Sequence, residues 1–376
     1  MLENVEPSPE ENEVVINSAG LDGLNGISWN EALKRVSGSR IQQTVHGAKI
    51  RWNMDGQKPY FLTARRNGED IGQLYLHRGF VHPDLMQWGP SLLKWDILHR
   101  LWGIISWFGG PVIYQPDDYE EVLRAFLSQV DLLIEQNGIT AVKNATPAFY
   151  EEKLDWHVTN AIYREYGYDV KQRATIYLDI EDNLDGLWSG LSREARQKVR
   201  KAERLGVEVT EENSIQGLED YYTVRQENAR RNGLRAPSRA SILASEPVYM
   251  SDGLAKLFLA KYQGEVIAGQ LLVVFNGNVQ LGGISYSDRS RQLRLPANDA
   301  LQWAVIRWAL ESGQRRIDWA GYTPEPKSEK EKGINRFKEK WGGQVIRYNV
   351  YDKIIASKRF MGLDWVKSQL RRFDIR

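Results

Sequence analysis

The segment that decides the fold is Val279–Tyr348, which reads VQLGGISYSDRSRQLRLPANDALQWAVIRWALESGQRRIDWAGYTPEPKSEKEKGINRFKEKWGGQVIRY. Its apolar start with adjacent glycines, Val279–Tyr286, predicts a buried strand. We expect a polar, basic loop next. Pro296 then suits the first position of a helix, and Asp299 suits the positive end of that helix dipole.

The helix predicted after Pro296 carries one apolar stripe and ends at Gly313. The stripe consists of residues spaced at i, i+3, i+4 and i+7, namely Leu301, Ala304, Val305 and Trp308. A short strand is predicted over Arg316–Ala320. A charged loop, the pair Phe337-Lys338 and a last strand over Gln344–Tyr348 follow.

This order of elements is typical of the second half of an acetyltransferase-like (GNAT) domain. The segment also resembles the FemABX family of aminoacyl-tRNA-dependent peptidyltransferases. No single residue is specific for that family, but the order and spacing of several are: Asp288, Pro296, Trp308-Ala309, Gly313, Asp318, Gly321 and Phe337-Lys338. The resemblance implies an α/β (α+β) fold with two tandem GNAT-like domains. Each would be a mixed, mostly antiparallel sheet flanked by helices.

The first half of the chain repeats this order in a degenerate form. Two strands flank the turn Arg66–Glu69, which is a hairpin signal. A strand, an amphipathic helix over Asp117–Gln136, another strand, a helix and a strand are predicted to follow. We therefore expect a disordered acidic N-terminus (1–14), a first domain (15–174), a second, acyl-donor domain (175–348) and a basic segment that packs back on the first domain (349–376).

Composition limits the classes of partner. The chain has 376 residues, which favours two domains, and a net charge of +1, so any polyanion must be met by local clusters. It has no cysteine, which excludes disulfides and a cysteine nucleophile. No apolar run reaches the ~20 residues of a membrane span. We expect a cytoplasmic, monomeric protein.

The tryptophan-rich insertion Phe80–Phe108 supports two interpretations. Trp95 and Trp102, with their neighbours, can fill a core between the domains. Alternatively, they rest at a lipid interface beside Lys94 and Arg100, which would suit a lipid-linked acceptor and peripheral contact with the inner membrane face.

A basic helix is predicted over Leu191–Gly206, with the sequence LSREARQKVRKAERLG. Such a run can be a solvated helix face. Here six basic residues outnumber two acidic ones, and the FemABX family carries a similar segment. The alternative is therefore contact with a tRNA backbone or a diphosphate. The candidate residues are Arg193, Lys198, Arg200 and Lys201.

The resemblance also implies substrate-binding residues. Arg231 matches an arginine that helps bind the substrate's phosphates, although a cation at a helix C-terminus is also favoured by the dipole alone. We expect Asp288 and Arg289, in the predicted polar loop, to bind the same substrate. Lys34 matches a phosphate-contacting lysine with a shift of one residue.

The motifs of common catalytic centres are missing: there is no G-x-S-x-G, P-loop or H-E-x-x-H sequence, and no metal site is predicted. In the resembled family, the positions of Phe337 and Lys338 line the channel for the tRNA acceptor end. An aminoacyl ester is already activated, so positioning and charge stabilisation suffice. Lys338 would place a cation beside the developing oxyanion or the ribose-phosphate, and Phe337 would stack on the adenosine. Read alone, they could be a surface cation and a core side chain.

The resemblance thus predicts an aminoacyltransferase that moves an aminoacyl group from aminoacyl-tRNA, its co-substrate, to an amine of a peptidoglycan-precursor-like, other cell-envelope or secondary-metabolite acceptor. No resident cofactor is expected. One alternative is an N-acyltransferase that uses acetyl-coenzyme A. Leu295 disfavours it, because a side chain there hinders the approach of backbone amides to a pyrophosphate. The other alternative is a non-catalytic double-GNAT binding module.

Two departures from the family pattern leave the acceptor and the general base open. Thr146 stands where some relatives have an acidic residue before a proline. Gly283 stands where relatives have a tyrosine.

Overall fold

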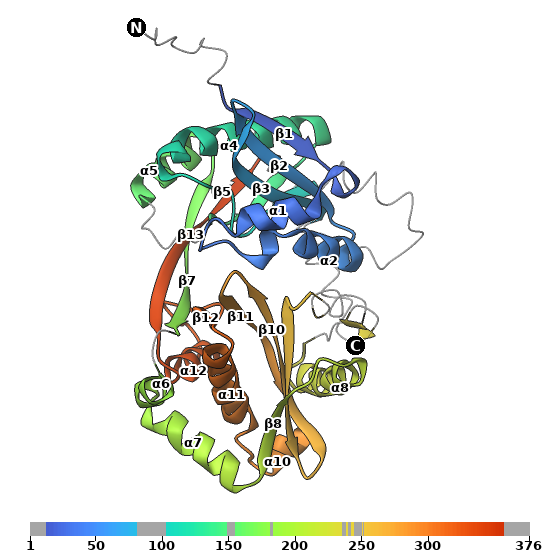
Figure 1. Cartoon of the computed structure of the whole chain (residues 1–376), viewed down its shortest axis with the longest axis vertical. Coiled ribbons are helices and arrows are strands. Elements are labelled where there is room, and N and C mark those ends of the chain that lie inside the picture. Colours follow the sequence, from blue (N-terminus) through green and yellow to red (C-terminus); the bar gives the residue numbers. More distant parts are fainter. Residues whose placement is uncertain are drawn as a thin grey trace, which may run out of the picture. The chain divides into compact units, whose positions relative to one another are not determined.

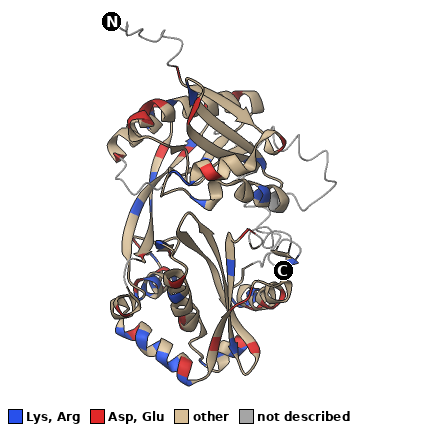
Figure 2. Ribbon diagram, in the orientation of Figure 1, with Lys and Arg blue, Asp and Glu red and all other residues tan. Residues whose placement is uncertain are grey.

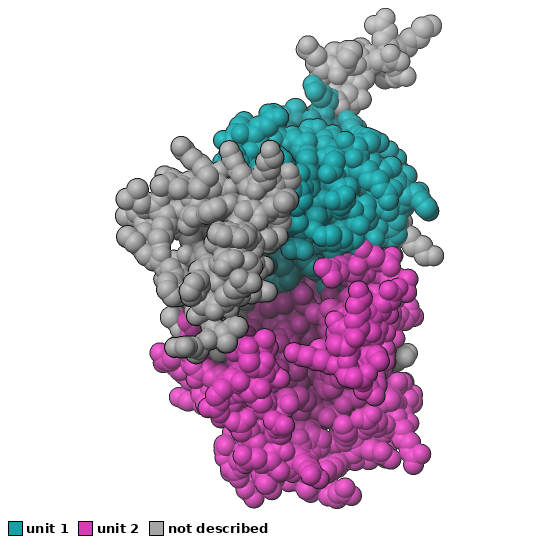
Figure 3. All heavy atoms as spheres, turned by 180° about the vertical axis from the view of Figure 1, so that it is seen from behind, with its two compact units in different colours: residues 1–171, 349–376 teal, residues 172–348 magenta. Residues whose placement is uncertain are grey.

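The computed structural model describes residues 13–80, 103–148, 155–180, 183–234, 238–239, 242–243, 250 and 252–356. The chain divides into two compact units (Figures 1 and 3): unit 1 is Met1–Lys171 with Asn349–Arg376, and unit 2 is Gln172–Tyr348. Three predicted features lie outside the described residues. They are the acidic N-terminus up to residue 12, the tryptophans of the insertion between residues 81 and 102, and the basic tail from residue 357.

Unit 1 is built on a sheet with the strand order β1-β2-β3-β4-β6-β13, and β5 pairs with β3. Within it, β4 and β6 are parallel, and the other described pairs are antiparallel. The strands are β1 (Val15–Ala19), β2 (Lys58–Arg66), β3 (Glu69–Phe80), β4 (Gly103–Ser106), β5 (Val112–Ile113), β6 (Ala141–Ala145) and β13 (Gln344–Ile354). The helices are α1 (Gly26–Leu33), α2 (Val45–Asp55), α4 (Tyr119–Asn137) and α5 (Trp156–Glu165), with short 3-10 turns at Leu21–Gly23, Ile41–Gln43 and Pro116–Asp118.

Helix α4 covers the core of unit 1. Its apolar positions recur with helical spacing, and the side chains of Val122, Phe126 and Val130 are fully buried. Gly138 ends the helix with a φ of 60°, a left-handed conformation that glycine adopts without a Cβ clash. Packing against α4 buries Leu74 and the other apolar residues of the sheet in one cluster.

Unit 2 has the strand order β7-β12-β11-β10-β9-β8. The β11–β12 pair is parallel, and the other described pairs are antiparallel. The strands are β7 (Asp169–Asp179), β8 (Val207–Glu211), β9 (Ala255–Tyr262), β10 (Glu265–Phe275), β11 (Asn278–Tyr286) and β12 (Arg316–Asp318). The helices are α6 (Leu184–Gly190), α7 (Arg193–Arg204), α8 (Ile215–Arg231), α10 (Asp288–Gln292), α11 (Ala297–Glu311) and α12 (Glu329–Glu339).

The two units repeat one order of elements, which can be followed in Figure 1. Unit 1 runs β2-β3-β4-α4-β6, and unit 2 runs β9-β10-β11-α11-β12. In each, a hairpin is followed by a third antiparallel strand, a helix and a strand parallel to the third. The prediction of two GNAT-like, mostly antiparallel sheets flanked by helices is confirmed.

Helix α11 is the central helix of unit 2. Three of the four predicted stripe residues, Leu301, Ala304 and Val305, are buried, and Trp308 packs partly buried against the same cluster. Pro296 is the residue before the first turn rather than within it, and Gly313 follows the helix with a φ of 67°. The predicted stripe therefore faces the core, but burial extends beyond it to Trp303 and Ile306.

Two local predictions are wrong. Asp288–Gln292 is a short helix rather than a loop, because Ser287 caps it by accepting a hydrogen bond from the Ser290 amide. The predicted charged loop contains helix α12, which begins at a capping box of Ser328 and Glu331. Asn25 caps α1 by accepting a hydrogen bond from the Ser28 amide. The last strand, predicted over Gln344–Tyr348, continues to Ile354 as β13.

Candidate functional site

A pocket opens in unit 2 at the point where two parallel strands part. The β11–β12 ladder holds only three pairs, the last of them Gln280 with Asp318. Strand β12 ends there, whereas β11 continues to Tyr286. The pocket has a volume of about 530 Å³. It is lined by Gln270, Leu281, Gly282, Gly283, Ile284, Asn298, Gln302, Trp319, Ala320, Lys330, Gly333, Ile334, Phe337 and Lys338.

Helix α12 forms one wall of the pocket with a single face. Its lining residues follow the helical spacing i, i+3, i+4, i+7 and i+8, so all of them point the same way: Lys330, Gly333, Ile334, Phe337 and Lys338. The amide of Asn335 ties the helix to the loop after β12, since it donates to the Thr323 carbonyl at 2.7 Å and accepts from the Thr323 amide at 3.2 Å. These two hydrogen bonds hold the wall against the loop that follows β12.

A β-bulge lies in the floor of the pocket. Gln270 pairs with Ile284 and Leu272 with Leu281, so two glycines of β11 oppose the single residue Leu271. A Cβ on Gly282 would lie 2.5 Å from the Leu271 carbonyl oxygen, so a side chain is not tolerated there. A Cβ on Gly283 would meet nothing within 4 Å. Gly283 thus leaves room in the pocket that a tyrosine at this position would occupy.

The ammonium of Lys338 is held by two backbone carbonyls. It donates to the oxygens of Ala320 and Gly321, which follow β12. This turn is fixed by Asp318, whose carboxylate accepts from the Ala320 amide at 2.9 Å and from the Thr175 hydroxyl. Burial lowers the pKa of Lys338, and the nearby Asp318 carboxylate opposes that shift. Since an ammonium has three N–H groups, one remains for a ligand.

Aromatic side chains back the α12 wall. Phe337 meets the Trp341 ring edge-on, with ring centroids 6.3 Å apart, and Trp341 stacks on Trp319 at 5.9 Å. The Lys340 ammonium lies 4.6 Å from the centroid of the Phe337 ring and forms a buried ion pair with Asp299 of α11. Phe337 and Trp319 both line the pocket, so its apolar surface is packed from behind.

Three polar atoms of the pocket lining have no partner among the described residues. They are Oδ1 of Asn298, Oε1 of Gln302 and Nε1 of Trp319. Buried polar atoms are normally paired, so this pocket is suited to a polar ligand. None of the three was predicted from the sequence. The available signal was weak: Asn298 and Gln302 are uncharged polar residues four positions apart on a helix that also carries charged residues.

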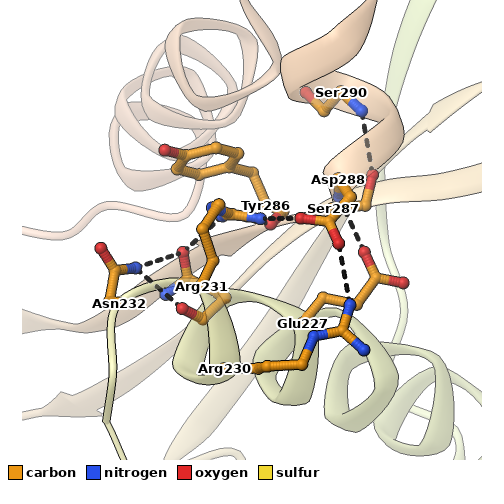
Figure 4. Close-up of polar contacts among 9 residues, drawn as sticks. Glu227, Arg230, Arg231, Asn232, Tyr286, Ser287, Asp288 and Ser290 are labelled. Carbon is orange, nitrogen blue, oxygen red and sulfur yellow. Dashed lines mark hydrogen bonds and ion pairs between the residues drawn. The ribbon is translucent and has the colours of Figure 1, made fainter.

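Arg231 and Asp288 form a separate cluster (Figure 4). The two side chains make an ion pair of 2.6 Å, and the Asp288 amide donates to Glu227 at 2.7 Å. Arg231 also donates to the Tyr286 carbonyl at 2.9 Å, and its guanidinium lies 4.2 Å from the centroid of the Tyr286 ring. Its hydrogen bonds, together with one from Arg230, hold the pKa of Asp288 below its usual value. The cluster joins α8 to the end of β11 and the start of α10.

The other predicted substrate-binding residues have partners of their own. Arg289 pairs with Glu265 and donates to Gln263 at 2.9 Å. Lys34 belongs to unit 1, where it pairs with Glu31 at 2.6 Å. Neither residue lines the pocket around Lys338.

The predicted basic helix is α7, and Figure 2 shows the concentration of Lys and Arg along it. Its apolar side, including Val199, is buried. Lys198 pairs with Glu194 at 2.8 Å, and Arg200 lies over the Trp188 ring at 5.4 Å. Arg193 and Lys201 are exposed. The helix follows directly on Ser192, whose amide donates to the Lys340 carbonyl at the end of α12 at 2.9 Å.

The structure thus brings Phe337 and Lys338 into one pocket and places the Arg231–Asp288 cluster outside its lining. Within the described part of the chain, no group of three or more His, Cys, Asp or Glu side chains could hold a metal ion. The described helices include none that is long and apolar enough to cross a membrane.

Comparisons with known proteins agree with this geometry. Residues 189–339 match the family model of the acetyltransferase (GNAT) domain. Among solved structures, the chain is similar to FemX, with 17% identity, a TM-score of 0.71, and coverage of 92% of this chain and 99% of that one. No curated protein matches the sequence significantly.

Two further solved structures share the fold. One is the C-terminal domain of a putative lysylphosphatidylglycerol synthetase from Agrobacterium fabrum, with 13% identity, a TM-score of 0.55, and coverage of 89% of this chain and 96% of that one. The other is a tandem GNAT protein from the clavulanic acid biosynthesis pathway, with 11% identity, a TM-score of 0.53, and coverage of 91% and 99%.

Residues 189–339 therefore form a domain of the acetyltransferase (GNAT) type. More particularly, the chain has the double-GNAT fold of FemX, as its resemblance to the FemABX family implies.

Proposed function

We propose that this protein is an aminoacyltransferase that moves an aminoacyl group from aminoacyl-tRNA to an amine acceptor and forms an amide bond. The observation that carries the proposal is the Lys338 ammonium, held by two carbonyls in a pocket of about 530 Å³ with one N–H left over. The fold shared with FemX supports it. The similarity to the C-terminal domain of a putative lysylphosphatidylglycerol synthetase supports it as well.

The proposed reaction needs little from the protein beyond positioning and charge. The acceptor nitrogen attacks the ester carbonyl carbon, and the carbonyl oxygen becomes an oxyanion that the free N–H of Lys338 stabilises. The C–O bond to the ribose then breaks, the ribose oxygen leaves with a proton, and the attacking nitrogen loses one. Phe337 lines the pocket beside this centre, and we expect its ring to contact the terminal adenosine. No side chain is assigned as the base.

The acceptor proposed from the family resemblance is a cell-envelope or secondary-metabolite precursor that carries an amine. Lys34 is the candidate for its phosphates in unit 1. Arg231 is a weaker candidate, because Asp288, Asn228 and the Tyr286 carbonyl already occupy its guanidinium. A donor of this kind places the protein in the cytoplasm. We propose that it acts as a monomer, with peripheral membrane contact if the acceptor is lipid-linked.

The donor class can be tested directly on the purified protein. A mixed aminoacyl-tRNA pool and acetyl-coenzyme A are supplied in separate reactions with a mixture of amine acceptors, and loss of ester or thioester is measured. We expect discharge of aminoacyl-tRNA and none of acetyl-coenzyme A. Discharge of acetyl-coenzyme A alone would instead support an N-acetyltransferase, the activity that the name of the matched GNAT domain suggests. Discharge of neither would favour a binding module.

Neutralising α7 is expected to weaken tRNA binding. The double variant Arg193→Gln, Lys201→Gln loses two exposed cations. If each cation contacts a phosphate, the slope of log Kd against log salt concentration should fall by about 0.7–0.9 for each contact. The measurement is filter binding of tRNA between low and physiological salt. The control is Lys49→Gln, which removes one exposed lysine of α2. Equal slopes in all three proteins would make α7 a solvated face.

A further inference from the structure

Gln302 presents a hydrogen-bond acceptor whose direction is fixed by its neighbours. Its Nε2 donates to Oε1 of Gln270 at 2.5 Å, and Nε2 of Gln270 donates to the Gly282 carbonyl at 3.3 Å. A carbonyl can only accept, so Gly282 dictates which end of the Gln270 amide faces it. Gln270 in turn dictates the orientation of Gln302. The atom left over on Gln302 is therefore an oxygen, not an NH₂ group.

This oxygen is buried and unpaired. Gln302 is 1% exposed, it lines the pocket, and its Oε1 has no partner among the described residues. Trp319, which is 4% exposed, lines the same pocket with an unpaired donor, its Nε1–H. Besides Oδ1 of Asn298, the pocket thus offers this buried acceptor and one buried donor. A site of this kind favours a ligand that satisfies both and rejects an analogue that lacks one.

An aminoacyl ester has this complement of groups. Its α-amino group is a donor and its carbonyl oxygen an acceptor, whereas an acetyl or fatty acyl group has the carbonyl alone. We infer that Gln302 is a specificity-determining residue, whose Oε1 accepts a hydrogen bond from the α-amino group of the bound aminoacyl donor. Gln270 acts as a positioning residue for it. The inference rests on the proposed function and deepens it, because it names the group by which the donor is recognised.

The test compares two donors that differ in one group. The mixed pool identifies the amino acid that the protein discharges. The same tRNA is then charged with that amino acid or with its deamino analogue, which has hydrogen in place of the α-amino group. We expect the parent protein to discharge the aminoacyl form about 10- to 100-fold faster in single turnover. Equal rates for the two donors would overturn the inference and leave the proposed function standing.

Variants then assign the preference to Gln302. Gln302→Met removes the acceptor at similar volume, so the ratio of the two rates should fall towards one. The assignment would be overturned if the Gln302→Met protein kept the parent's ratio. It would also be overturned if Asn298→Ala lost the preference and Gln302→Met did not.

Two safeguards keep the outcomes separate. Thermal unfolding and circular dichroism establish that each variant folds. If Gln302→Met does not, Gln270→Leu takes its place: it frees the Gln302 amide to rotate, so the same ratio should fall. If the parent protein discharges no aminoacyl-tRNA at all, the proposed function and this inference are both wrong.

Discussion

Replacing Lys338 with alanine is expected to lower the rate of aminoacyl transfer by about 10²- to 10³-fold, the usual effect of removing one donor to a developing oxyanion. The carbonyls of Ala320 and Gly321 hold the Lys338 ammonium in the pocket. Its third N–H is the hydrogen-bond donor that the substitution removes. The measurement is single-turnover discharge of saturating aminoacyl-tRNA in the presence of acceptor. At saturation, a loss of rate reflects the transition state rather than donor binding.

Two controls separate charge from structure. Lys338→Met keeps most of the volume and removes only the ammonium, so it should lose as much rate as Lys338→Ala. Lys332→Ala removes a lysine of the same helix that pairs with Glu329 at the surface, and it should transfer at the parental rate. Normal turnover in a folded Lys338→Ala protein would remove this residue from the proposed chemistry.

The pH dependence of transfer offers an independent check on Lys338. Burial lowers its pKa, so its charge is lost at a lower pH than that of an ordinary lysine. The acceptor amine must be neutral to attack, which makes the rate rise with pH at first. The rate should then fall as pH rises through the lowered pKa of Lys338, and this falling limb should be missing in Lys338→Met. A parent profile with no such limb would mean that the charge of Lys338 is not needed.

The fold was predictable because its signals are local or repeated. The apolar stripe of α11, the hairpin turn Arg66–Glu69 and the order of strands and helices in both halves follow from periodicity and turn residues. The helix α12 was readable too, since Ser328 and Glu331 have the spacing of a capping box. The residues that follow Ser328 are mostly charged, so no strong apolar stripe marks this segment as a helix.

The pocket was predictable only in part, because it depends on distant contacts. Phe337 and Lys338 stood out through the family resemblance. Gln270 and Gln302 lie 32 positions apart and become one hydrogen-bonded pair only when α11 packs on the sheet. The bulge at Gly282 depends on the register of β10 against β11, which no local pattern of either strand specifies.

Lys340→Met is expected to destabilise the protein by about 3–5 kcal/mol, because it leaves Asp299 charged and buried without its partner. The ion pair joins α12 to the first turn of α11, and both side chains are only 8% exposed. For a unit of this size, such a loss corresponds to a drop of about 6–20 °C in the unfolding midpoint. Near-ultraviolet circular dichroism is a suitable probe, since Trp341 and Trp319 stack beside the pair.

A double-mutant cycle shows whether this cost belongs to the pair. Asp299→Asn with Lys340→Met removes both charges, so the double variant should lose clearly less stability than the sum of the two single variants. The surface pair Lys332–Glu329, with side chains 51% and 79% exposed, is the matched control and should contribute about 0–1 kcal/mol. Strict additivity would show that Lys340 stabilises through its contacts with Phe337 and Trp341 instead. In that case the pocket wall, rather than the helix junction, depends on Lys340, and transfer should fall in Lys340→Met even at temperatures where the variant is fully folded.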